Sequence, residues 1–146
     1  MKNTTLMRYS LIGLTALTVL FSCKKDKDED ALKPPAERIL GKWNLVKESE
    51  KTYEYNTGAF KDSTGRNIPV GIFTLEFRTN GMVYEAVKDD DEIQRDTLPY
   101  ELVSESLLRI DGLDYNITKF TNTELRTTGY YDDGTSDVEH LLEFKK

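Results

Sequence analysis

The chain has 146 residues, with 26 Asp and Glu against 20 Lys and Arg, and a formal net charge of −6 at pH 7. An acidic surface repels phosphate backbones, and the sequence shows no basic face with interleaved aromatic residues, so nucleic acid is not an expected partner. The length suits one domain with one core, and the only cysteine has no second cysteine to pair with. We therefore expect a domain that is stabilised by its core without a disulfide.

The N-terminus has the layout of a secretion signal. Lys2 and Arg8 precede an apolar run, Leu11 to Phe21, that is shorter than the roughly 20 residues that span a bilayer. It ends in Leu20-Phe21-Ser22-Cys23, which resembles the lipobox of bacterial lipoproteins. The resemblance implies a signal peptide over 1–22, cleavage before Cys23 and acylation of Cys23, for example with palmitate. Two or three acyl chains anchor a protein stably to a membrane. The alternative is a plain secretory peptide cut nearby, which would leave Cys23 as an incidental thiol.

A dense run of charge, Lys24 to Asp30, follows the cysteine. Such a run cannot bury apolar surface, so we expect residues 23–36 to form a flexible, disordered tether. Lysine followed by acidic residues directly after Cys23 also resembles the surface-export signal of lipoproteins in the Bacteroidetes group. The resemblance implies an outer-membrane lipoprotein that faces the periplasm or the cell surface, and the charge run favours the surface.

The remaining residues, 37–146, are expected to form the globular domain. Ala36 to Leu40 suits one helical turn ended by Gly41. From there the apolar residues alternate with polar ones, which is typical of half-buried strands. The alternation predicts eight strands, within the segments GKWNLVKESEKTYEY, GIFTLEFRTN, GMVYEAVK, DTLPYELVS, LLRID, LDYNITKF, TELRTTGYY and DVEHLLEFKK.

The connections between these strands predict the topology. Asn80-Gly81 indicates a two-residue hairpin turn, which would set Phe77 beside Tyr84 and Leu75 beside Ala86. Most connections are short, and sequential antiparallel strands close most simply into a meander. The exception is Asn56 to Gly71, a long loop expected to cover the mouth. We predict an all-β fold, an eight-stranded antiparallel up-and-down barrel.

Two stretches carry a resemblance to a family. ILGKWNLV resembles the first strand of lipocalin-like domains, with their Gly-x-Trp motif at Gly41-Lys42-Trp43, and TLEFRTNGMVY resembles the second hairpin of small lipocalin-like lipoproteins of Bacteroidetes. The resemblance implies that Gly41 and Trp43 close the barrel and that a cation, Arg109 or Arg126, packs over Trp43. Of the family's Thr-Asp-Tyr motif only Leu113-Asp114-Tyr115 is present, and the family's disulfide is absent.

The candidate site residues are those that the alternation directs inward. The set that would line a ligand cavity is Phe73, Phe77, Tyr84, Tyr100, Tyr115 and His140. His140 either faces a polar ligand group or is satisfied by a neighbouring hydroxyl. The alternation directs four glutamates outward into solvent: Glu76, Glu85, Glu101 and Glu143.

Catalysis is not expected, because the sequence shows no Ser-His-Asp ordering, no metal-ligand spacing and no glycine-rich phosphate loop. We predict no catalytic residue, no cofactor and no metal, and we expect a monomer. The first functional hypothesis is a lipid-anchored carrier that binds a small hydrophobic or amphipathic ligand. The alternative is a cell-surface protein-interaction module of the inhibitor or immunity type, with a filled barrel and exposed tyrosines such as Tyr130 and Tyr131.

Overall fold

A computed structural model describes residues 31–132 and 134–146. The predicted signal peptide, Cys23 and the charged run that follows it lie outside the described residues. No helix in the described part of the chain is long and apolar enough to cross a membrane.

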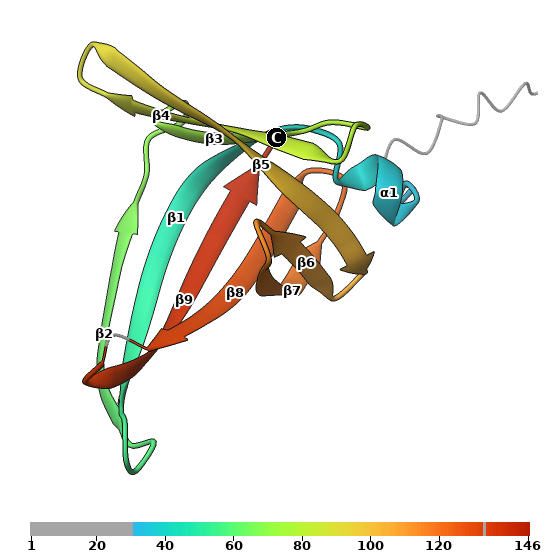
Figure 1. Cartoon of the computed structure of the whole chain (residues 1–146). Helices are drawn as coiled ribbons and strands as arrows, with labels where there is room; N and C mark the ends of the chain where they lie inside the picture. Colours follow the sequence, from blue (N-terminus) through green and yellow to red (C-terminus); the bar gives the residue numbers. More distant parts are fainter. Residues whose placement is uncertain (1–30, 133) are drawn as a thin grey trace, which may run out of the picture.

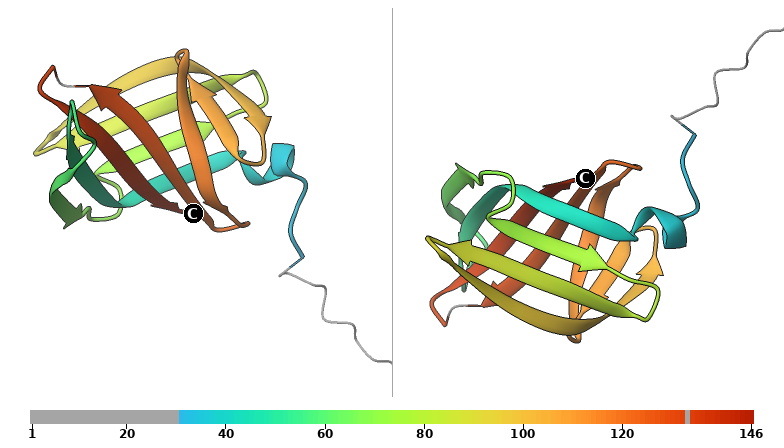
Figure 2. Two further views of the ribbon diagram at one scale, coloured as in Figure 1. Left: turned by 90° about the horizontal axis from the view of Figure 1, so that it is seen from below. Right: turned by 90° about the horizontal axis from the view of Figure 1, so that it is seen from above.

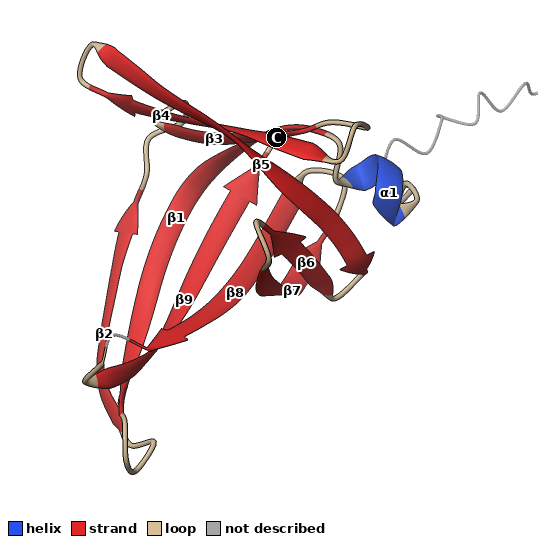
Figure 3. Cartoon of the chain, in the orientation of Figure 1, coloured by secondary structure: helices blue, strands red, loops and turns tan. Residues whose placement is uncertain are grey.

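The described chain is one antiparallel sheet preceded by a single helical turn (Figure 1 and Figure 3). The helix is α1 (Pro35–Arg38), and Pro34 and Pro35 set its start because the fixed φ of proline suits the first helical turn. The strands are β1 (Gly41–Glu54), β2 (Phe60–Asn67), β3 (Phe73–Phe77), β4 (Met82–Asp89), β5 (Glu92–Ser104), β6 (Leu107–Ile110), β7 (Leu113–Phe120), β8 (Glu124–Asp132) and β9 (Ser136–Lys145).

Eight of these strands close into a barrel. β1 pairs with β3, each later strand pairs with the next as far as β9, and β9 pairs back with β1 from Asn44↔Lys145 to Glu54↔Ser136. Figure 2 shows the strands curving around one closed wall, with α1 beside one end of it. This confirms the predicted eight-stranded up-and-down barrel, because β9 pairs back with β1 and closes the meander.

The ninth strand corrects the prediction of an unstructured loop over residues 56–71. Phe60 to Asn67 form β2, which pairs with the outer half of β1 from Lys47↔Asn67 to Tyr53↔Phe60. β1 has 14 residues and β3 only 5, so the outer half of β1 extends beyond β3. The backbone N–H and C=O groups on that part of the β1 edge need hydrogen-bonding partners, and β2 supplies them. β2 therefore extends the barrel wall alongside β1, which is not the predicted cover over the mouth (Figure 1).

The predicted register of the β3–β4 hairpin is also wrong. Phe77 lies opposite Val83, and the Arg78 amide donates to the Met82 carbonyl at 3.1 Å, so that three residues, 79–81, make the turn. Gly81 adopts the positive φ of +75° that such a turn requires. The extra turn residue shifts the pairing by one, which places Val83 and Glu85 on the inner face of β4 where Tyr84 and Ala86 were expected.

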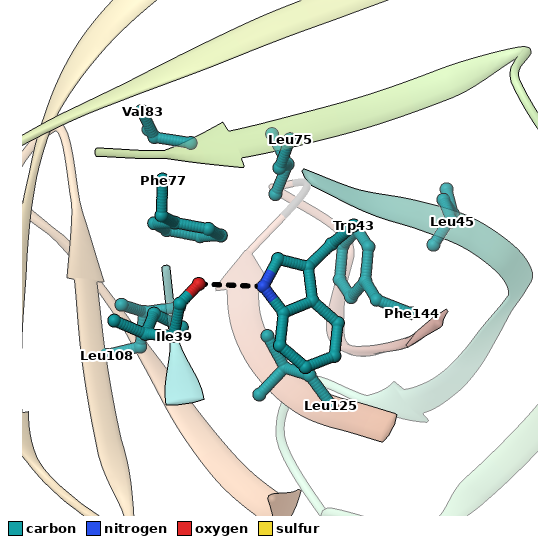
Figure 4. Close-up of a cluster of buried hydrophobic side chains, with 9 residues drawn as sticks. All are labelled: Ile39, Trp43, Leu45, Leu75, Phe77, Val83, Leu108, Leu125 and Phe144. Atoms are coloured by element: carbon teal, nitrogen blue, oxygen red, sulfur yellow. Dashed lines mark hydrogen bonds between the residues drawn. The ribbon is translucent and has the colours of Figure 1, made fainter. Parts of the chain in front are cut away.

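One end of the barrel is closed by packed apolar side chains around Trp43 (Figure 4). The indole is 0% exposed and its Nε1 donates to the Ile39 carbonyl at 2.7 Å, which ties β1 to the segment after α1. The buried cluster consists of Ile39, Trp43, Leu45, Leu75, Phe77, Val83, Leu108, Leu125 and Phe144.

The cation over Trp43 is Lys146, and the expectation of Arg109 or Arg126 is wrong. Lys146 Nζ lies 4.6 Å from the ring centroid and donates to the carbonyls of Arg38 and Leu40, each at 2.8 Å. Arg109 and Arg126 alternate with the buried Leu108 and Leu125, so both guanidinium groups lie on the outer face, where Arg109 pairs with Asp114 and Arg126 with Glu143.

Candidate ligand site in the barrel lumen

Above the closed end, the barrel encloses an apolar cavity of about 190 Å³. Phe73 and Phe144 both line it, and their rings pack against each other in a tilted contact with centroids 6.5 Å apart. Apolar cavities of roughly 150 Å³ stay dry and accept a molecule the size of benzene, so this volume is large enough for a small organic ligand. The lining residues are Phe73, Leu75, Glu85, Leu98, Leu108, Ile110, Asp111, Leu113, Tyr115, Leu125, Thr127, Leu142 and Phe144.

Strand alternation builds this lining. Successive inward residues two apart come from β3 (Phe73, Leu75), β6 (Leu108, Ile110) and β9 (Leu142, Phe144). Leu75, Leu108, Leu125 and Phe144 also belong to the buried cluster around Trp43. They therefore form the floor of the cavity, and the Trp43 cluster closes the barrel beneath it.

Two of the predicted cavity residues, Phe73 and Tyr115, line this lumen. The Tyr115 ring packs over Gly129 of β8, where an added Cβ would approach ring carbons to 3.2 Å. Burial raises the pKa of the Tyr115 hydroxyl, and the charge of Glu85 raises that pKa further. The glycine thus gives the ring room to lie flat against the barrel wall.

Phe77 and Tyr100 belong to the closed end and do not line the cavity. Phe77 is buried among the residues around Trp43, and the Tyr100 ring meets it edge-on with centroids 4.8 Å apart. The Tyr100 hydroxyl donates to the Arg78 carbonyl at 2.9 Å, which holds the β3–β4 turn against the barrel. Phe77 and Tyr100 therefore pack the closed end of the barrel.

The interior position predicted for Tyr84 is wrong. The register of the β3–β4 hairpin places it opposite Glu76, on the outer face. There the Arg78 guanidinium lies 4.1 Å from the centroid of its ring, and Asn80 Nδ2 donates to its hydroxyl at 3.2 Å.

His140 lies on the inner face of β9, toward the open end of the barrel and outside the apolar cavity. Its Nε2 lies 2.9 Å from Glu48 Oε1, so its partner is a carboxylate and not the hydroxyl that we expected. Arg66 of β2 contacts the other oxygen of Glu48 at 2.8 Å, and the Tyr131 hydroxyl donates to Glu50 at 3.2 Å. Burial tends to raise the pKa of Glu48, but the hydrogen bonds from Arg66 and His140 outweigh it and the pKa is lowered.

Glu48, Glu50 and His140 offer ligand atoms within 4.8 Å of one another, a grouping that the sequence did not indicate. The grouping was missed because β1 has a bulge between Leu45 and Lys47. The bulge shifts the alternation, so that Glu48 and Glu50 face inward. Each member of the group already has a hydrogen-bonding partner, and Arg66 neutralises the carboxylate of Glu48. We therefore interpret the group as a polar network that links β1, β2 and β9.

Glu85 is the functional candidate that the sequence placed on the wrong face. The shifted register turns it inward, opposite Leu75 on one side and Asp96 on the other, and it lines the apolar cavity. Burial raises the pKa of its carboxyl, and the neighbouring Asp96 raises that pKa further.

Three exposed aromatic side chains and the half-buried Tyr53 gather where the β1–β2 and β8–β9 turns meet. The Tyr53 and Phe60 rings pack edge-on with centroids 6.0 Å apart, and a surface hollow of about 490 Å³ includes Tyr53, Tyr130 and Tyr131. Tyr130 is 66% exposed and Phe60 is 61% exposed. We call Tyr53, Phe60, Tyr130 and Tyr131 the aromatic rim.

No family model matches the chain, and no curated protein matches it. Among solved structures, the chain is similar to a deswapped triple mutant of the bovine odorant-binding protein, at 16% identity and a TM-score of 0.44 over 75% of this chain and 74% of that chain. It is also similar to the odorant-binding protein OBP1, at 15% identity and a TM-score of 0.48 over 79% of this chain and 75% of that chain. Similarity at this level assigns no ligand, and the strand pairing itself defines the fold.

Proposed function

We propose that the protein is a lipid-anchored envelope lipoprotein of the outer membrane that binds a small hydrophobic or amphipathic molecule reversibly in the barrel lumen. The observation that carries the binding role is the apolar cavity of about 190 Å³ above a closed, Trp43-centred barrel end. The lipobox-like sequence before Cys23 and the charge run after it support the anchor and the location.

The lumen is suited to binding by burial of apolar surface. Each buried methylene group contributes about 0.8 kcal/mol, so an eight-carbon chain contributes about 6 kcal/mol before the cost of immobilising it. The net affinity expected from these two opposing contributions is micromolar or weaker, which suits reversible exchange. The lining also includes carboxylates, a phenol and a threonine hydroxyl. Polar groups of this kind orient a bound ligand.

Calorimetric titration of the full chain with 1-octanol tests the proposal, with two adjacent substitutions on β9. Leu142→Trp fills the lumen and is expected to weaken binding by about tenfold or more, since the chain would lose most of its buried contact. Leu141→Trp is the matched control, because the neighbouring residue faces outward. Equal binding by the two variants, with both folded by circular dichroism, would place the ligand outside the lumen.

The membrane anchor is tested separately with Cys23→Ala. Without the thiol no lipid is attached, so the variant is expected in the soluble fraction while the unchanged chain partitions into detergent. Continued partitioning of the variant into detergent would contradict a lipid anchor on Cys23.

The aromatic rim supports a second candidate, a protein-interaction surface, since exposed tyrosine and phenylalanine side chains are enriched at interfaces. On that hypothesis, the double variant Phe60→Ser, Tyr130→Ser would lose a partner recovered from the envelope of the source cells. Octanol binding would be unchanged, because neither residue lines the lumen.

A further inference from the structure

The lumen contains a carboxylate that the fold leaves without a counter-charge. Glu85 projects from β4 into the apolar cavity, between Leu75 of β3 and Asp96 of β5. Within residues 31–132 and 134–146, its side chain has neither a hydrogen bond nor an ion pair, and the neighbour that acts on its charge is another acid, Asp96. Placing a carboxylate in apolar surroundings is costly unless a partner is supplied.

The groups around Glu85 add negative charge. Asp96 lies directly opposite it in the β4–β5 ladder, and Asp111 lines the same cavity from the β6–β7 turn. Two like charges facing each other across a strand pair are unfavourable. Besides these acids, the titratable side chain of the cavity lining is Tyr115, and none of the described residues that line the apolar cavity is Lys, Arg or His.

An adjoining hollow of about 180 Å³ continues from Glu85 along the β4–β5 hairpin, lined by Val87, Gln94, Arg95 and Asp96. Arg95 pairs with Ala86, a neighbour of Glu85 that faces the outer surface, and it makes no ion pair with Glu85 in the described structure. Glu85 thus stands at the boundary between an apolar chamber and a more polar one. That boundary is the position at which the charged end of an amphipathic ligand would lie.

We infer that the lumen selects a cationic amphiphile, with its hydrocarbon part in the apolar cavity and its protonated amine paired with Glu85 and supported by Asp96. The inference rests on the proposed ligand-binding function and specifies the class of ligand. A fatty acid of the same length would set its carboxylate against Glu85, Asp96 and Asp111. A neutral alcohol would keep the apolar contacts and forgo the ion pair.

The pairing gives the affinity a pH dependence. Glu85 must be ionised to attract the amine, and its pKa lies above the ordinary value of 4.5 because of burial and Asp96. Amine binding is therefore expected to weaken as the pH falls through that raised pKa. Binding of 1-octanol is not expected to follow it.

The test is calorimetric titration of the full chain with octylamine, 1-octanol and octanoate, three probes with one chain length and different head groups. Octylamine is expected to bind about tenfold or more tightly than 1-octanol, and octanoate more weakly than either. Glu85→Gln is expected to remove the preference for octylamine while 1-octanol binds as before. Glu76→Gln removes one negative charge from the outer face and is the control, for which the preference should remain.

The outcomes separate the two proposals. If 1-octanol binds in the lumen but octylamine shows no preference, or the preference survives Glu85→Gln, the cationic ligand class is wrong and the apolar carrier stands. If no probe binds the unchanged chain, both proposals are overturned. A preference that is lost with Glu85→Gln and kept with Glu76→Gln supports both.

Discussion

Trp43 shows how one side chain fixes the closed end of the barrel. Its ring is fully buried, its Nε1 satisfies the Ile39 carbonyl, and Lys146 covers its face. The same indole therefore joins the helix segment, the first strand and the end of the last strand, and it forms the support beneath the apolar cavity.

Trp43→Phe is expected to lower the free energy of unfolding by about 2–3 kcal/mol, because the smaller ring leaves a void and the Ile39 carbonyl loses its donor. Lys146→Met, which keeps the length of the chain and removes the charge, is expected to cost about 1 kcal/mol or less. Urea denaturation of both variants and the unchanged chain measures the difference. A loss from Trp43→Phe no larger than that from Lys146→Met would contradict the role given to the indole.

Glu85 makes the opposite contribution, because its charge lies in apolar surroundings beside a second acid, Asp96. Its pKa is raised above the unfolded value of 4.5, so its favourable protonated state is present below that pH and is lost as the pH rises through the folded pKa. Glu85→Gln is therefore expected to be more stable than the unchanged chain at neutral pH and equal to it below pH 4.5. Urea denaturation at the two pH values checks this, and a less stable variant at neutral pH would show that the carboxylate has a partner.

At the scale of elements, the polar network links three strands at the open end. Glu48 of β1 accepts from Arg66 of β2 and lies in hydrogen-bonding contact with His140 of β9. Since the exposed β2 buries no side chain, it is held to the barrel by this network, the backbone ladder, the Tyr53–Phe60 ring contact and the bond that Lys61 donates to Ser136.

The lowered pKa of Glu48 gives that link a pH dependence. The stabilisation is present above the unfolded pKa of 4.5 and is lost as the pH falls through the lower, folded value. The unchanged chain is expected to lose this stability in acid, and Glu48→Gln, which lacks the titrating group, to lose less over the same range. Unfolding followed at several pH values measures the slope, and identical slopes would show that Glu48 is not coupled to folding.

The elements also show what the sequence could predict. Alternation located all eight barrel strands, because their inward residues are apolar. The phase of β4 depended on one extra turn residue, and that of β1 on one bulge. Both are backbone details that the side-chain pattern leaves open, and they moved Tyr84 out of the interior and Glu85 and Glu48 into it. β2 was missed because its residues are exposed on both faces and show no apolar period.

At the scale of the whole molecule, the two ends of the barrel differ. Asn122, in the turn between β7 and β8, bonds both Ala31 and Lys33 and so holds the start of the described chain beside the closed end (Figure 1). Arg38, 4% exposed, fixes α1 at that end by donating to the Phe120 carbonyl at 2.7 Å. A tether leading from this end to a lipid on Cys23 would leave the polar network and the aromatic rim facing away from the membrane.

The central claim is that the ligand lies in the lumen, and an NMR measurement of intermolecular nuclear Overhauser effects tests it directly. With octylamine bound to the full chain, we expect contacts from the methylene protons to the ring protons of Phe73, Tyr115 and Phe144, which line the cavity. Contacts confined to Phe60 and Tyr130 would place the ligand on the aromatic rim and contradict a luminal carrier.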